Sequence, residues 1–73
     1  METIHIKNIL SEREYEVMEK VAKGKSNKEI AEEISRDEVT VKKHLQHAFP
    51  KLGVRNRTEA TVKFLMLSGV LNH

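Results

Sequence analysis

The sequence predicts an all-α fold of four short helices, and three observations indicate it. Helix start signals recur along the chain, and apolar residues repeat at helical spacing. Apart from a weak hint at Ile4, Ile6 and Ile9, no stretch alternates apolar and polar residues as a strand does. With 73 residues, 38% of them apolar, and no Trp, the chain can form one small aliphatic core and a single domain.

The first helix is expected at 12–23, behind Ser11. Glu14 follows Ser11 at three residues, the spacing of a capping box, in which each side chain accepts from the backbone N–H of the other residue. Its apolar stripe consists of Val17, Met18 and Val21. The residues before it are expected to be an arm at 1–9, either loose or packed on the core, with the folded domain at 10–73.

The second helix is short and is expected to begin after Ser26. Ser26 and Glu29 repeat the spacing of a capping box. One face of this helix is apolar and carries Ile30, Ala31 and Ile34. The amphipathic pattern predicts that this face packs against the core.

The third helix is expected to begin at Glu38, with the Asp37 carboxylate as its cap. Steps of four, three and four residues place one apolar stripe along it: Val41, Leu45, Ala48 and Leu52. Pro50 lacks an N–H and crowds the preceding turn, so it is expected to end or bend this helix near Phe49.

The fourth helix is expected from Arg57 or Thr58 to Ser68, with Asn56 and Glu59 at the spacing of a third capping box. Apolar residues surround most of its circumference, which is typical of a helix with a second partner. We therefore expect a dimer contact through exposed members of the set Phe64, Leu67, Val70 and Leu71. Burial of both faces against the first and third helices is the alternative.

The charge is unevenly distributed, although the net charge is only +2. Residues 1–38 hold seven basic and ten acidic groups, a balance of −3, whereas residues 39–58 hold five basic groups and no acidic one. These five are Lys42, Lys43, Lys51, Arg55 and Arg57. Lys42, Lys43 and Gln46 lie opposite the apolar stripe of the third helix, which therefore has a core face and a basic, polar face. A merely solvated helix face is the alternative interpretation.

Several function classes are excluded by what the chain lacks. Without cysteine there is no disulfide framework, thiolate zinc site or cysteine nucleophile. His44 and His47 have no evident further ligands, so no metal site is expected. The carboxylates near Glu29 lack a pocket and a nucleophile, so no enzyme is expected.

The chain also gives no reason to expect a membrane or a small-molecule ligand. The apolar stretch at 64–67 falls far short of the roughly 18 residues that span a bilayer. A domain of this size leaves no room for a drug-sized pocket. We therefore expect no cofactor, and we expect the protein in the cytoplasm.

The connection between the second and third helices is short. Only Ser35, Arg36 and Asp37 separate them, as in a helix-turn-helix, whose second helix lies in the major groove of DNA. The basic face would then meet base edges and phosphates. Free N–H groups at helix starts bind phosphate, and polar residues stand at two such starts: Ser26, Asn27 and Lys28, then Arg55, Asn56 and Arg57.

Two segments, LSEREYEVMEKVAKGKSNKEIAEEI and TVKKHLQHAFPKLGVRNRTEA, carry a resemblance. From Leu10 to about Val62, the chain resembles the LuxR-type (GerE-like) helix-turn-helix domain. The resemblance implies a tetrahelical DNA-binding output domain of bacterial transcription regulators, whose third helix reads DNA and whose fourth commonly forms the dimer contact. The start at Met1 favours the small stand-alone GerE-like regulators, and a detached output domain of a response regulator is the alternative.

The resemblance also implies roles for individual residues. Lys42, Lys43 and Gln46 occupy base-facing positions, where Lys can donate to guanine and Gln can pair with adenine. The set expected at the DNA backbone is Ser26, Asn27, Lys28, Thr40, His44, His47, Lys51, Arg55, Asn56 and Arg57. The implied partners are double-stranded DNA, a second copy of the chain and RNA polymerase.

Three positions depart from the family pattern. Arg36 replaces an apolar residue in the turn, Asp37 replaces the usual Ser or Thr cap, and Pro50 replaces a basic residue. Asp37 caps a helix well but repels a nearby phosphate. These departures keep a second hypothesis open, an HTH-shaped protein-interaction module that does not contact DNA.

Overall fold

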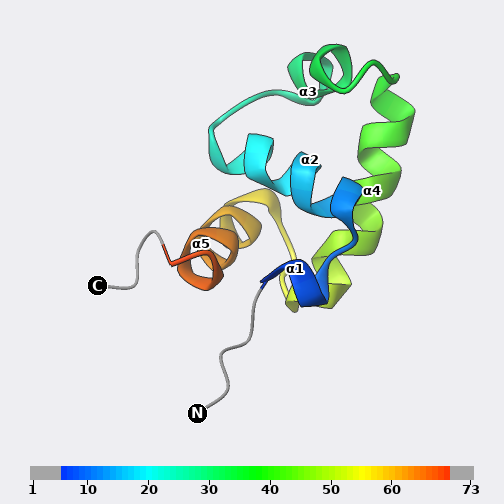
Figure 1. Ribbon diagram of the computed structural model, residues 1–73. Coiled ribbons are helices and arrows are strands. Elements are labelled where there is room, and N and C mark those ends of the chain that lie inside the picture. Colours follow the sequence, from blue (N-terminus) through cyan, green and yellow to red (C-terminus); the bar gives the residue numbers. More distant parts are fainter. Residues whose placement is uncertain (1–5, 70–73) are drawn as a thin grey trace.

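The structure, a computed structural model, describes residues 6–69 as helices joined by short loops (Figure 1). Its elements in that range are α1 (Ile6–Ile9), α2 (Glu12–Ala22), α3 (Asn27–Glu33), α4 (Glu38–Leu52) and α5 (Arg57–Leu67). The four predicted helices are present as α2 to α5, and residues 6–69 contain no strand. The all-α fold class is therefore confirmed.

The segment before α2 contributes one helical turn, α1, that the sequence pattern does not predict. Ile9 is half-buried against the core, and Leu10 is part of the core. Packing on the core is therefore seen at Ile9 and Leu10. Ile6 and Ile9, two members of the weak apolar alternation, lie in α1 and form no strand. Its third member, Ile4, lies outside the described residues.

Two capping boxes fix the starts of α2 and α3 as predicted. The Ser11 hydroxyl accepts from the Glu14 N–H at 3.1 Å, and Glu14 Oε1 accepts from the Ser11 N–H at 3.0 Å. Ser26 and Glu29 make the same pair of bonds at 3.1 and 2.8 Å. Each box satisfies donors that the helix itself leaves free, so these two starts are determined locally.

The caps of α4 and α5 are one-sided. Asp37 Oδ1 accepts from the Thr40 N–H at 2.8 Å, which confirms Asp37 as the cap of α4. Asn56 Oδ1 accepts from the Glu59 N–H at 2.9 Å, but Glu59 Oε1 accepts from the N–H of Arg55 at 3.0 Å, not from Asn56. The predicted third box is wrong in this half, because the Glu59 carboxylate accepts from Arg55, one residue before the cap.

The core gathers around α2, which packs against α3, α4 and α5 (Figure 1). Tyr15 on α2 and Phe64 on α5 stack at a tilt, with ring centroids 5.2 Å apart. The predicted stripes of α2, α3 and α4 all lie in this core, whose buried apolar members are Leu10, Val17, Met18, Val21, Ile30, Ala31, Ile34, Val41, Leu45, Ala48, Leu52, Ala60 and Phe64.

The turn between α3 and α4 is closed by backbone hydrogen bonds. Ser35 has a positive φ of 57°, and the Arg36 N–H bonds back to the Ala31 carbonyl at 2.9 Å, which is a Schellman-type ending. Ile34 is buried, whereas Arg36 is exposed. The apolar plug that Arg36 cannot provide is therefore supplied by Ile34, and α4 leaves the turn in a fixed direction.

Helix α4 continues through Pro50 to Leu52, so the predicted end near Phe49 is wrong. Pro50 is exposed in the last turn and removes one backbone hydrogen bond, the one that its N–H would donate to the carbonyl of Gln46, without ending the helix. Leu52 is 4% exposed and anchors that turn to the core. Gly53 then ends the helix with φ 71°, and its N–H bonds to the Pro50 carbonyl at 3.1 Å.

Candidate nucleic-acid interface

One side of α4 holds the helix to the core, and the opposite side faces solvent. Lys42, Lys43 and Gln46, the predicted base-facing residues, are all exposed. Within residues 6–69, no hydrogen bond or ion pair engages their side chains. Asp37 is close enough to Lys43 to have its pKa lowered by that charge, after the larger effect of the bonds from Thr40. The three side chains are therefore available to a ligand, on a helix whose position is fixed.

The residues expected at the DNA backbone divide into free and engaged side chains. Lys28, Arg55 and His47 are exposed, and their side chains make no hydrogen bond or ion pair within the described range. Ser26 and Asn56 are exposed but serve as helix caps. The half-buried members are Asn27, Thr40, His44 and Arg57.

Lys51 is held by an ion pair that the sequence does not reveal. Its Nζ lies 2.7 Å from Glu14 Oε1, and the Glu14 side chain is only 7% exposed. Burial alone would raise the pKa of Glu14, but the hydrogen bonds from Lys51 and Ser11 outweigh it and lower the pKa. The pair ties the end of α4 to α2, so part of the Lys51 charge is neutralised within the protein.

Arg57 joins α5 to the start of α3. Its guanidinium donates to Asn27 Oδ1 and to the Lys25 carbonyl, each at 2.8 Å. Two of the residues expected at the DNA backbone, Asn27 and Arg57, therefore hold each other. The planar fork of arginine suits such a two-point contact, which joins the start of α5 to the loop before α3.

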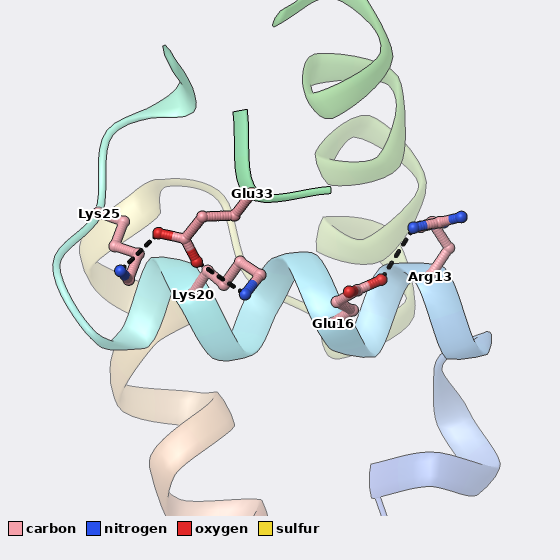
Figure 2. Close-up of polar contacts among 5 residues, drawn as sticks. All are labelled: Arg13, Glu16, Lys20, Lys25 and Glu33. Atoms are coloured by element: carbon pink, nitrogen blue, oxygen red, sulfur yellow. Dashed lines mark hydrogen bonds and ion pairs between the residues drawn. The ribbon is translucent and has the colours of Figure 1, made fainter. Parts of the chain in front are cut away.

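Ion pairs also neutralise part of the excess acidic charge of residues 1–38 (Figure 2). The Glu33 carboxylate lies between Lys20 of α2 and Lys25 of the following loop, at 2.8 and 2.5 Å. The hydrogen bonds from Lys20 and Lys25 lower the pKa of Glu33 to about 2. Arg13 and Glu16 form a further pair along α2 at 3.0 Å, which the i, i+3 spacing could have indicated.

His44 is turned toward α2. Burial, followed by the charge of Arg13, lowers its pKa. The lowered pKa favours the neutral imidazole, which has one N–H to donate. In the described part of the chain, no three His, Asp or Glu side chains form a group that could hold a metal ion.

The exposed apolar face of α5 differs from the one expected. Phe64 is 3% exposed and belongs to the protomer's own core, so it is not an exposed dimer residue as predicted, while Leu67 is half-buried against the core. Val70 and Leu71 lie outside the described residues. A groove of about 360 Å³ instead runs along α5, lined by Val54, Thr58, Glu59, Val62, Lys63 and Met66.

The helix lengths also bear on membrane contact. Within residues 6–69, no helix is long and apolar enough to cross a bilayer.

Known proteins resemble this chain over most of its length. Residues 8–64 match the family described as bacterial regulatory proteins, luxR family. The chain is 44% identical over 62 residues to the nitrate/nitrite response regulator protein NarP of Escherichia coli (strain K12) and 43% identical over 61 residues to the spore germination protein GerE of Bacillus subtilis (strain 168). It is 46% identical over 56 residues to the transcriptional regulatory protein DesR of Bacillus subtilis (strain 168).

These relatives differ in how much of them the chain spans. The matches cover 85%, 84% and 77% of this chain, but 29% of NarP, 82% of GerE and 28% of DesR. The shared part is therefore the domain described above, and NarP and DesR contain much more. No solved structure matches the chain significantly.

Proposed function

Since the chain belongs to the luxR family of bacterial regulatory proteins, we propose that it regulates transcription by reading a DNA sequence as a homodimer, with α4 in the major groove. As a member of that family it is a helix-turn-helix DNA-binding domain of a transcription regulator and not an enzyme. The observation that carries the proposal is the exposed, unengaged face of Lys42, Lys43 and Gln46 on a helix fixed by its other side.

The dimensions of α4 suit the major groove. Its 15 residues give a rod about 22 Å long, and a groove about 12 Å wide admits one helix. Lys42 and Lys43 would donate to guanine O6 and N7 or to phosphate, and Gln46 would pair with adenine. Each such contact distinguishes bases or fixes the register on the duplex.

Phosphate contacts would flank this reading face. Lys28 and Arg55 bring free positive charge, and the exposed His47 side chain would add a hydrogen-bonding group from α4. Ser26, Asn56, Thr40 and His44 would add neutral hydrogen-bond donors to these contacts. For Asn27, Lys51 and Arg57 the intramolecular bonds support a mainly positioning role.

A second copy would bind along the groove of α5. Val62 and Met66 are 46% and 50% exposed, which is costly in water unless a partner covers them. Glu59 and Lys63 line the same groove, and a two-fold axis can bring each close to its opposite on the other copy. Leu67, with Val70 and Leu71 beyond the described residues, would extend this contact.

The cellular location and further partners follow from DNA as the proposed ligand. A regulator of this family acts on chromosomal DNA, so we place the protein in the bacterial cytoplasm and expect RNA polymerase as a further partner. Two copies double the base contacts of one short helix and select half-sites about one helical turn apart.

Binding to promoter DNA across a salt series tests the proposal. Lys42→Ala and Lys43→Ala should each weaken binding, and each should reduce the salt slope by about 1 if the lysine contacts phosphate, or relax base preference if it reads an edge. Lys23→Ala is the matched control, because Lys23 is an exposed lysine at the end of α2. Absence of DNA binding by the dimer at low salt would overturn the proposal and favour a protein-interaction module.

A further inference from the structure

An exposed valine stands on the reading face of α4. Val39 is 62% exposed, a larger fraction than Val62 or Met66. Its spacing to Lys43 and Gln46, four and seven residues, places the three side chains in one row along the outward side of the helix. Val39 is therefore part of the same surface as the residues proposed to read bases.

Val39 has no evident role in folding. It belongs neither to the buried core nor to the half-buried residues packed against the core, and it does not line the α5 groove. A β-branched residue on an exposed helix is also a weaker helix former than alanine or a long polar residue. Its presence is better explained by a ligand than by stability.

The residues around Val39 indicate which part of the DNA it would contact. Asp37 and Glu38 precede it, and both are exposed and acidic, so this end of α4 repels a phosphate backbone. The base edges at the groove floor carry no net charge, and thymine presents a 5-methyl group there that apolar side chains contact.

We propose that Val39 makes an apolar contact with the 5-methyl group of one thymine in each half-site, and so sets the base preference at that position. The inference rests on the proposed function, because it requires α4 in the major groove. It adds a specificity-determining residue to the lysines and glutamine, one that reads shape and apolar surface where the others read hydrogen bonds.

Replacing single thymines by uracil tests the contact, because uracil lacks the methyl group but pairs identically with adenine. A duplex that the wild-type protein binds is first selected from random DNA. Binding of the protein to this duplex is then measured by fluorescence anisotropy. At one thymine per half-site, the replacement should weaken wild-type binding about fourfold, the effect expected for one buried methyl group. Val39→Ala removes the contact from both half-sites, so it should bind the unmodified duplex about as weakly as the wild type binds a duplex with uracil in both half-sites, and it should not respond to uracil at that position.

Two features keep the result interpretable. Alanine is a better helix former than valine, so Val39→Ala keeps α4 folded. Lys23→Ala removes an exposed side chain at the end of α2, away from α4 and from the α5 groove, and this control should keep the response to uracil. Wild-type binding that is insensitive to uracil at every position, or a Val39→Ala protein that responds as the wild type does, would overturn the inference while DNA binding itself stands. A wild-type protein that binds no DNA would overturn the proposed function as well.

Discussion

Replacing Lys51 by methionine tests whether the link between α4 and α2 stabilises the fold. Lys51 Nζ lies 2.7 Å from Glu14 Oε1. Methionine has a similar length but no charge, so the variant leaves the Glu14 carboxylate with only Ser11 as a hydrogen-bond donor. The carboxylate stays buried at 7% exposure, which makes the loss costly.

The structure sets the size of the effect. A hydrogen bond to a charged group contributes about 1.5–3 kcal/mol. The Lys51 side chain is 44% exposed, so water screens its charge, and we expect the free energy of unfolding to fall by about 1–2 kcal/mol at pH 7. In a domain of this size, each kcal/mol lowers Tm by about 4–8 °C.

The effect should depend on pH in a definite direction. In the wild type, burial opposes ionisation of Glu14, but the bonds from Lys51 and Ser11 prevail and hold its pKa below 4.5. Such a group stabilises the fold above its unfolded pKa, and the stabilisation is lost as pH falls through the folded pKa. Without Lys51 the pKa of Glu14 rises, so the difference in stability between wild type and variant should narrow as the pH falls from 7 toward 3.

Urea unfolding measures both the loss of unfolding free energy at pH 7 and its change with pH. Circular dichroism follows the transition, since the chain has no Trp for fluorescence. Lys23→Met is the control, because Lys23 is exposed and has no ion pair among residues 6–69. A Lys51→Met protein as stable as the wild type at pH 7, or one whose loss is equal at pH 7 and pH 4, would refute the reasoning.

Three further predictions follow from other contacts. Asp37→Ser keeps an oxygen to cap α4 but removes a negative charge near the DNA, so Tm should fall slightly, because the charge favours the helix start, and DNA binding at low salt should become several-fold tighter; equal or weaker binding would contradict the predicted repulsion. Glu33→Gln removes the negative charge between Lys20 and Lys25 and one of the two oxygens that accept from them, and it should destabilise the protein at neutral pH. The pKa of Glu33 is lowered to about 2, so its stabilisation is complete above about 4.5 and lost toward 2, and denaturation curves of wild type and variant should converge over that range. Met66→Glu should leave the monomer folded and abolish dimers in analytical ultracentrifugation, and a dimer that persists would exclude the α5 groove.

The features that the sequence predicts correctly are those determined locally. Ser11 and Glu14 are three residues apart, so their capping box follows from spacing alone. The stripes of α2, α3 and α4 follow from periodicity, and they fix which side of α4 is exposed.

The features that the sequence misses depend on the tertiary fold. Lys51 and Glu14 are 37 residues apart, and Arg57 and Asn27 are 30 apart, so no local rule pairs them. Apolar residues surround α5, and only the packing of α2 against it decides that Phe64 is buried while Met66 is exposed. The effect of Pro50 depends on its place in the last, solvent-facing turn of α4.

Selection of bound fragments from random DNA tests the central claim most directly, because it reports sequence preference, symmetry and spacing together. Two copies that each place α4 in the major groove should enrich an inverted repeat whose half-sites are centred about 10 base pairs, one helical turn, apart. Lys43→Ala should enrich a degraded version of the same repeat. Recovery of no common motif, at a salt concentration where the dimer is intact, would contradict the claim that this face of α4 reads DNA.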